Sequence, residues 1–368
     1  MHNVIARIAR DQPECELGWM RATLIILHRW TALVVGVILL GTAASGASLV
    51  FEGAIDRGLH PELWTAPPSG ALLSIDTMVA RVEAKYPQGK VGAVSLSPVP
   101  GRAWTMSAGG LTVFVNPYTG NITGTRTAQE SQTTLSRRLH VFHVELFAGR
   151  IGRTIVGVAT CVALFLVLTG IILWWPDKLI RISTTASWKR INFDLHHALG
   201  IVAALILIVI TASGLVIHYD ALTNAIRSLD AAPPAPAPQQ AAGNGGALQS
   251  FDALAAAAHG ALPGATIMFI SNGGAKNPAT VAMRFPEDRT PGGRSRVFID
   301  RYTGVILGNV STRNAQTGTR IDNLKRSLHA GDVLGKPTEA LWFLAALVMV
   351  SQIVTGFAMW WNARRARR

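Results

Sequence analysis

Histidine is the residue type in this chain that is best suited to carry chemistry. The 368 residues include only two cysteines, Cys15 and Cys161, which excludes a disulfide framework or a thiolate cluster. They include ten histidines, and a neutral imidazole is a common ligand of transition metals. The histidines stand at positions 2, 28, 60, 140, 143, 196, 197, 218, 259 and 329.

Short motifs recur along the chain and sort these histidines. Val113–Gly120 is similar to Val297–Gly304, at an offset of 184 residues, and each reads as a strand followed by a turn. Pairs of small residues recur as well: Thr169-Gly170 with Thr355-Gly356 at an offset of 186, and Ser45-Gly46 with Ser213-Gly214 at an offset of 168. The chain is therefore predicted to be a duplication.

The same offsets relate four of the histidines. His28 lies 168 residues before His196, and His143 lies 186 residues before His329. A twofold axis between two repeats brings equivalent inward-pointing positions face to face. Two opposed imidazoles on two helices form a bis-histidine haem site. His140, His197 and His218 have no equivalent histidine, and they remain alternative ligands.

Four apolar segments are long enough to cross a membrane, and the low charged fraction of 15% argues against an ordinary soluble enzyme. They are Thr23–Val50, Thr154–Trp175, Ala198–Ile217 and Ala340–Trp361. Lys and Arg gather before the first, between the second and third, and after the fourth, so both termini are predicted to be cytoplasmic. The net charge of +13 is thus assigned to membrane orientation and not to nucleic-acid binding.

The domain prediction follows from these spans. Each half starts in the cytoplasm and consists of a span, an external α+β module and a second span, so the repeats are parallel. The modules contain helices near 74–86 and 251–261, and second strands that begin at Ile122 and Ile306. The boundaries are 1–22 cytoplasmic, 23–50 first span, 51–153 first external module, 154–175 second span, 176–197 cytoplasmic loop and start of the third span, 198–217 third span, 218–339 second external module with a Pro/Ala linker at 231–246, 340–361 fourth span, and 362–368 cytoplasmic tail. The linker is predicted to have no structure and no packing residues.

The absence of other metal-binding motifs narrows the choice of cofactor. The sequence has no Cys-x-x-Cys-His for covalent haem, no His-Glu-x-x-His for zinc hydrolysis, and no acidic cluster within the spans for a di-iron site. Two non-covalent b-type haems are therefore predicted, with iron held by His28 and His196 and by His143 and His329. The negatively charged propionates of a haem need cationic partners, and Arg29, Arg150 and Lys336 are predicted to bind them.

Several of these motifs carry a family resemblance. They include Leu27-His28-Arg29-Trp30, Asn116-Pro117-Tyr118-Thr119-Gly120, His143-x-x-Leu146-x-x-Gly149 and His329-x-Gly331. Together they resemble the PepSY-associated transmembrane proteins of bacterial inner membranes, over nearly the whole chain. The resemblance implies PepSY-like periplasmic modules, two haems, and transfer of electrons to a ferric siderophore for iron uptake.

The expected protein is therefore a mainly α integral membrane oxidoreductase of the bacterial inner membrane. It has four transmembrane helices in two parallel repeats and two PepSY-like periplasmic modules, and it releases Fe(II) from a periplasmic ferric siderophore. No Gly-x-Gly-x-x-Gly is present, so the electron donor is expected to be quinol or a separate cytoplasmic reductase. The alternatives are a non-redox membrane protein that regulates a periplasmic peptidase, and a transporter of an iron chelate.

Overall fold

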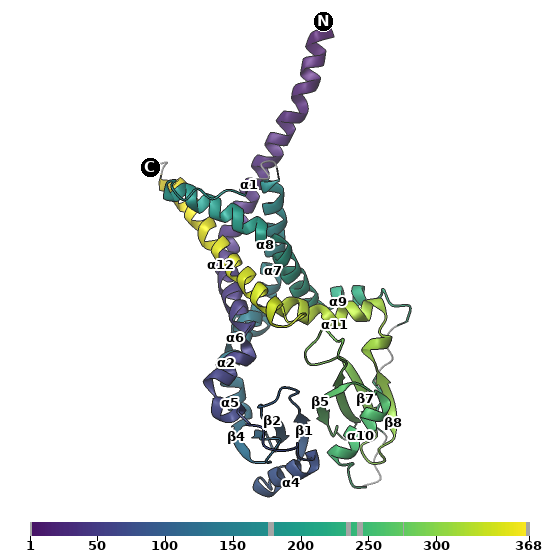
Figure 1. The fold of residues 1–368 in the computed structure, drawn as a ribbon. Coiled ribbons are helices and arrows are strands. Elements are labelled where there is room, and N and C mark those ends of the chain that lie inside the picture. Colours follow the sequence, from purple (N-terminus) through teal and green to yellow (C-terminus); the bar gives the residue numbers. More distant parts are fainter. Residues whose placement is uncertain (1, 176–179, 233–236, 241–245, 275, 366–368) are drawn as a thin grey trace.

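The computed structural model describes residues 2–175, 180–232, 237–240, 246–274 and 276–365. A helical bundle occupies one end of the molecule, and a β-sheet with its covering helices occupies the other (Figure 1). The amino-terminal helix and the end of the last helix leave the bundle on the side away from the sheet.

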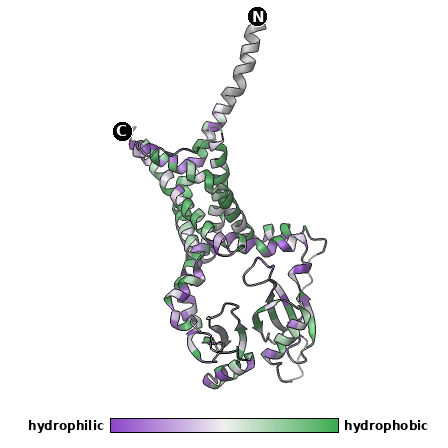
Figure 2. Cartoon of the chain, viewed as in Figure 1, coloured by the Kyte–Doolittle hydropathy of each residue, from purple (hydrophilic) through white to green (hydrophobic). Residues whose placement is uncertain are grey.

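The bundle is built from four long helices: α1 (His2–Leu49), α7 (Gly149–Trp174), α8 (Trp188–His218) and α12 (Lys336–Arg365). Each contains a segment that is long and apolar enough to cross a membrane, which in α1 is Gly18–Leu49. Hydrophobic residues predominate along the bundle (Figure 2), and at most 33% of the apolar window of each helix is buried, so many of them lie on the outside. The prediction of four candidate membrane helices is confirmed. α1 packs on α7 and α12, and α8 packs on the same two helices.

Shorter helices lie between the bundle and the sheet. They are α2 (Glu52–Leu59), α3 (Pro61–Trp64), α5 (Ala128–Thr133), α6 (Leu135–Glu145), α9 (Asp220–Arg227), the 3-10 helix η1 (Thr312–Asn314) and α11 (Thr317–Ala330). α6 packs on α1 and α7, and α11 packs on α8. α11 is followed by Gly331 as its C-cap, whose φ of 81° is left-handed and whose missing side chain makes room for Trp342.

The strands of both predicted modules form one antiparallel sheet. They are β1 (Val91–Ser95), β2 (Trp104–Ala108), β3 (Leu111–Val115), β4 (Ile122–Thr127), β5 (Thr266–Ser271), β6 (Ala279–Arg284), β7 (Ser295–Ile299) and β8 (Ile306–Val310). Their order is β4-β3-β2-β1-β5-β6-β7-β8, so the two halves join through β1 and β5. At that junction Val94 stands opposite Ile270. The sequence predicted two modules and gave no sign that they share one sheet.

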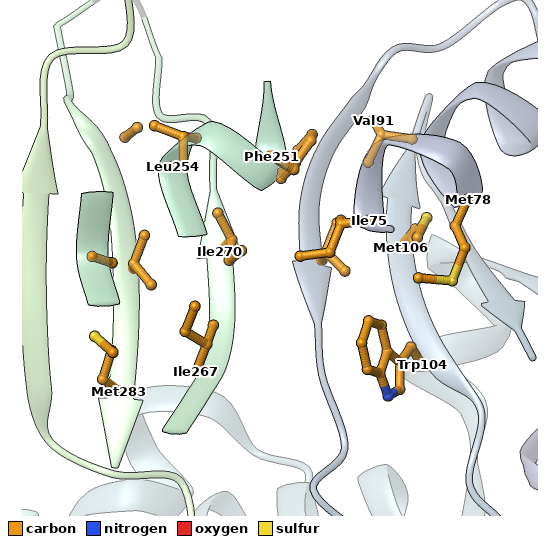
Figure 3. Packing of buried hydrophobic residues seen from close by; sticks show 14 of the residues in the cluster. Ile75, Met78, Val91, Trp104, Met106, Phe251, Leu254, Ile267, Ile270 and Met283 are labelled. Atoms are coloured by element: carbon orange, nitrogen blue, oxygen red, sulfur yellow. The ribbon is translucent and has the colours of Figure 1, made fainter. Parts of the chain in front are cut away.

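One apolar core serves both halves of the sheet. The predicted helices are present as α4 (Ile75–Lys85) and α10 (Phe251–Ala261), and both pack on the strands. Met78 of α4 and Leu254 of α10 are buried in the same cluster as Met106 and Ile270 of the strands (Figure 3). Burial of this continuous apolar surface stabilises the two halves as a unit.

The linker prediction is wrong at Gln240. Residues 233–236 and 241–245 of the linker lie outside the described residues, but Gln240 between them is buried. Its Nε2 donates to the Asp300 carboxylate at 2.8 Å, and its Oε1 accepts from Arg301 N at 3.0 Å. Composition alone suggested an unpacked segment, but one amide side chain satisfies both a carboxylate and a backbone N–H.

Candidate functional site

The outer pair of histidines meets between the bundle and the sheet. His143 lies near the end of α6, and His329 lies near the end of α11. Their ring centroids are 6.0 Å apart, with 46° between the ring planes. The structure therefore brings together the two residues that the 186-residue offset paired.

Both outer rings are buried and held through Nδ1. His143 Nδ1 donates to the carbonyl of Thr42 in α1 at 2.9 Å, and His329 Nδ1 donates to the carbonyl of Ile210 in α8 at 2.9 Å. A carbonyl only accepts, so the proton is on Nδ1 and Nε2 carries the lone pair. Burial, together with the neighbouring His329, lowers the pKa of His143 to about 4, and burial also lowers the pKa of His329. Both rings are thus neutral near pH 7, which is the form that binds a metal.

Glycines make room for these rings. A Cβ placed on Gly46 would lie 2.9 Å from Cε1 of His143, and a Cβ on Gly214 would lie 3.0 Å from Cε1 of His329. Both distances are shorter than carbon–carbon contact allows. The recurrent Ser-Gly motifs therefore seat the histidine rings against α1 and α8.

The inner pair is held by threonines. His28 of α1 bonds through Nδ1 to Thr169 Oγ1 of α7 at 2.8 Å, and His196 of α8 bonds to Thr355 Oγ1 of α12 at 2.9 Å. Each threonine hydroxyl already donates its proton to a carbonyl one turn earlier in its own helix. The hydroxyls therefore accept from Nδ1–H, and the lone pair is again on Nε2.

The four histidines thus share one state. Within the described part of the chain, Nε2 of His28, His143, His196 and His329 has no hydrogen-bond partner. A lone pair on Nε2 and an Nδ1–H fixed by an acceptor is the usual arrangement of a metal-binding histidine. The threonines and the two carbonyls were not assigned this role from the sequence, although the Thr-Gly repeat contained a signal for the threonines.

The alternative histidines are placed differently. His140 is half-buried on α6, three residues before His143, and it is His143 that contacts His329. The His197 ring packs on Phe193 at 4.2 Å. His218 packs on the neighbouring Tyr219 ring at 4.6 Å.

The candidate propionate partners lie at the surface. Arg29 and Arg150 are exposed, and the Arg29 guanidinium lies 5.8 Å from the Trp30 ring centroid. Lys336 is 78% exposed and forms an ion pair of 2.5 Å with Glu339.

Four apolar helices and an eight-stranded antiparallel sheet define a multi-pass integral membrane protein, in which His143 lies beside His329, and His28 and His196 each bond to a threonine of a neighbouring helix. The family model described as the PepSY-associated TM region matches residues 25–363. The chain therefore belongs to the PepSY-associated transmembrane family. No curated protein matches the chain.

Proposed function

We propose that the chain is an inner-membrane reductase that holds two b-type haems and passes electrons to a ferric siderophore in the periplasm. The outer haem is held by His143 and His329, and the inner haem by His28 and His196. The two halves of the chain are parallel repeats, and both termini are cytoplasmic.

The observation that carries this proposal is the spacing of the outer rings. Metal–imidazole bonds of about 2.0–2.1 Å on opposite sides of one ion put the ring centroids roughly 6 Å apart. The centroids of His143 and His329 are 6.0 Å apart, and neither Nε2 has a hydrogen-bond partner among the described residues. His143 and His329 would therefore be the residues that hold one haem iron on this side of the bundle.

The donor set favours haem over other metal sites. In the described part of the chain, no group of three or more His, Cys, Asp or Glu side chains is placed to hold a metal ion. Two imidazoles leave the remaining coordination positions to a non-protein ligand, and a porphyrin supplies four nitrogens in one plane. Haem iron then supplies one-electron transfer.

Residues around the four histidines would position a bound haem and influence its redox potential. The carbonyls of Thr42 and Ile210 fix the outer imidazoles in one tautomer and one orientation. Thr169 and Thr355 do the same for the inner imidazoles. Hydrogen bonds of this kind raise the basicity of a ligating imidazole and would thereby influence the redox potential of an iron bound there.

The internal repeat is supported by the hydrogen bonds. The acceptors Thr42 and Ile210 are 168 residues apart, as are Gly46 and Gly214. Thr169 and Thr355 are 186 residues apart. Equivalent histidines therefore have equivalent partners, which supports two related halves around a common axis.

The orientation is supported by the charges at the bundle ends. α1 begins and α12 ends on the side away from the sheet (Figure 1). Basic residues in the first part of α1 (Arg7, Arg10 and Arg21) and at the end of α12 favour the cytoplasm for that side, which puts the sheet in the periplasm. The substrate is then met outside, and quinol or a cytoplasmic reductase supplies the electrons.

The test is reduction of a ferric chelate by pre-reduced protein. The purified protein is reduced without oxygen, freed of reductant and mixed with a ferric chelate, and Fe(II) is trapped with a coloured ligand. Two electrons per chain, lost as the haem absorption shifts to its oxidised form, are expected to yield two Fe(II). A colourless protein, or a reduced protein that yields no Fe(II), contradicts the proposal and favours the non-redox alternative.

A further inference from the structure

Arg57 and Arg102 lie at the junction between the bundle and the sheet. Arg57 is on α2, which follows directly after α1, and Arg102 is in the loop between β1 and β2. The chain after α2 is bonded to that loop: Thr65 forms a β-bridge with Arg102, and Ala103 N donates to Trp64 O at 2.9 Å. This backbone pairing brings the two arginines into one neighbourhood.

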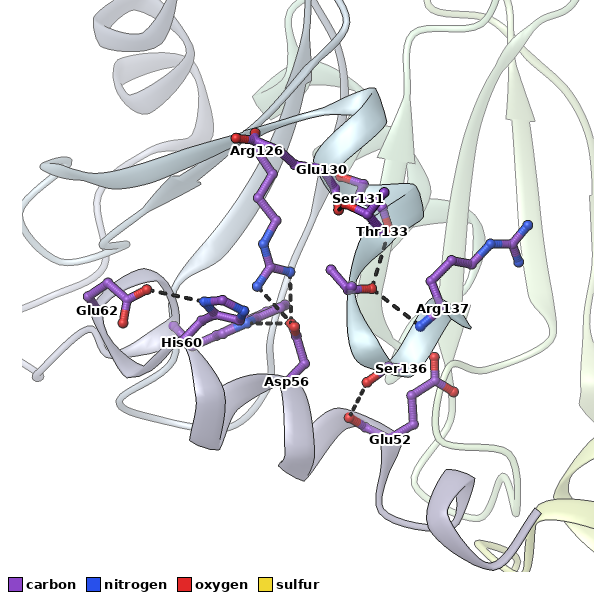
Figure 4. A network of polar contacts seen from close by, with 12 residues as sticks. Glu52, Asp56, His60, Glu62, Arg126, Glu130, Ser131, Thr133, Ser136 and Arg137 are labelled. Atoms are coloured by element: carbon purple, nitrogen blue, oxygen red, sulfur yellow. Dashed lines mark hydrogen bonds and ion pairs between the residues drawn. The ribbon is translucent and has the colours of Figure 1, made fainter. Parts of the chain in front are cut away.

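Asp56 and Glu339, the two carboxylates whose charge acts on Arg57, already have other partners. Both oxygens of Asp56 accept from Arg126, each at 2.9 Å, and Asp56 also accepts from the Trp64 indole (Figure 4). Glu339, at the start of α12, accepts from Lys336. Each carboxylate therefore has a cation of its own other than Arg57 and Arg102.

Arg57 and Arg102 thus lack an ion-pair partner among the described residues. Both side chains are half-buried, and within the described residues neither has a hydrogen bond to a side chain or an ion pair. Burial and the nearby Arg102 lower the pKa of Arg57, and the negative charges of Asp56 and Glu339 offset only part of this shift. Two neighbouring guanidinium groups without a partner carry an electrostatic cost that a bound anion offsets.

A small cavity adjoins Arg102. It has a volume of about 160 Å³ and is lined by Arg102, Trp104 and Tyr118, and by apolar residues that include Leu72 and Val99. Complete ligand pockets usually start near about 300 Å³, so this one accommodates a part of a ligand, such as one aromatic ring. The Trp104 indole donates to Ser97 O at 3.3 Å, which fixes the wall of the cavity.

A second cavity extends this site into the other half of the sheet. It has a volume of about 170 Å³, shares Pro98 with the first, and is lined by Arg284 and Phe285. Nε of Arg284 is buried and has no hydrogen-bond partner among the described residues. A ligand with several limbs therefore meets an arginine on both sides of Pro98.

We propose that Arg57, Arg102 and the cavity beside Trp104 and Tyr118 bind an anionic chelate with aromatic limbs, of the catecholate or aryl-carboxylate class. The guanidinium groups bind the anionic oxygens, and the aromatic side chains contact the ring. This inference rests on the proposed reductase function, because it names the class of substrate that the reductase would accept. Binding of the chelate can be measured without electron transfer.

The test is equilibrium binding of a redox-inert probe to the full-length protein in nanodiscs of zwitterionic lipid. The probe is the anionic gallium(III) complex of a hexadentate tris-catecholate. Arg57→Gln and Arg102→Gln are each expected to weaken its affinity about tenfold, which corresponds to loss of one charge-assisted hydrogen bond. Arg57→Lys and Arg102→Lys keep the charge and are expected to retain most of the affinity.

Arg137→Gln is the matched control. Arg137 is an exposed arginine of the same half, hydrogen-bonded to Gln132, and its loss removes the same charge away from the cavity. Its affinity is expected to equal that of the wild type. Equal weakening by all three Gln variants, or no weakening by Arg57→Gln and Arg102→Gln in protein with unchanged melting temperature, overturns the proposal.

Two further arms identify the ligand. A cationic gallium(III) trihydroxamate is expected to bind weakly and independently of Arg57 and Arg102, and equal binding overturns the assignment of an anionic chelate. Nanodiscs with anionic lipid test the lipid headgroup as occupant: if such lipid displaces the probe only when both arginines are present, the cavity is a headgroup site. Haem content is measured separately, so failure of the reductase proposal and failure of this site are distinguishable.

Discussion

Asp76 and Asp252 each cap the helix to which the other belongs. The Asp76 carboxylate accepts from the N–H groups of Phe251 and Asp252 at 2.8 and 3.3 Å. The Asp252 carboxylate accepts from the N–H groups of Ile75 and Asp76 at 2.9 and 3.1 Å. The first N–H groups of a helix have no partner in that helix and favour a negative charge. Each half of the sheet thus completes a helix of the other.

This reciprocity predicts a long-range effect on hydrogen exchange. Asp76→Ala is expected to destabilise the start of α10 by about 0.5–2 kcal/mol, as loss of a helix cap does, and to speed amide exchange there. Asp252→Ala is expected to do the same at the start of α4. Ser74→Ala is the control, because Ser74 caps its own helix through Thr77 N. Effects confined to the mutated helix would show that the two halves do not depend on each other.

The glycines beside the outer histidines give a second prediction. Gly46→Ala puts a methyl group 2.9 Å from the present position of His143 Cε1, so the ring is pushed from its seat. One of the two expected haems is then lost or its spectrum is altered. Gly36→Ala is the matched control in the same helix, because the nearest atom to its Cβ is 3.4 Å away. Identical spectra of both variants would argue against an outer site at His143.

The threonines that bond to the inner histidines, Thr169 and Thr355, give a third prediction. Thr355→Val keeps the shape of the side chain but removes the acceptor of His196 Nδ1. Loss of such a partner weakens metal binding by about 10–100-fold, so we expect a lower affinity for the inner haem, measured by haem titration. Thr160→Val is the control, because Thr160 Oγ1 bonds only to Val156 O among the described residues. Equal affinity in both variants would make the His196–Thr355 bond irrelevant to the cofactor.

The turn at Asp300 predicts a pH dependence of stability. Hydrogen bonds from Thr303 and Tyr302 N–H lower the pKa of Asp300 to about 2 from its ordinary 3.8. Because the folded pKa is depressed, the stabilisation is present above pH 3.8 and is lost as the pH falls through about 2. The melting temperature of wild type should therefore fall more between these pH values than that of Asp300→Asn. Asn116 makes the same two bonds in the first half without a titrating group, so Asn116→Ala should lower stability equally at both pH values.

Local patterns predicted much of the fold. The lengths of the apolar segments predicted the four long helices. The repeated strand-and-turn motifs predicted strands at residues 113, 122, 297 and 306, and the segments before them were predicted as the helices α4 and α10. The junction of β1 with β5 was not predictable, because no local pattern specifies which strand pairs with Val91–Ser95. The caps by Asp76 and Asp252 depend on that junction and were missed for the same reason.

The candidate site was predictable only where it repeats. The shared offset of 186 residues paired His143 with His329. On that ground alone, His143 was preferred to His140 as the metal ligand. The carbonyls of Thr42 and Ile210 are backbone atoms, which every residue has, so no residue type marks them. Arg57 and Arg102 come from segments that a β-bridge brings together, and their lack of a counter-ion emerges only after Asp56 is seen to pair with Arg126.

The number of haems per chain tests the central claim most directly. We would record the reduced-minus-oxidised spectrum of the detergent-purified protein and quantify pyridine haemochrome in wild type, His143→Ala and His196→Ala. His140→Ala and His197→Ala, each an adjacent histidine on the same helix, are the controls. The account predicts two b-type haems in the wild type and in both controls, and one in each of the other two variants. A wild-type protein without haem, or an equal loss in His140→Ala and His143→Ala, would contradict it.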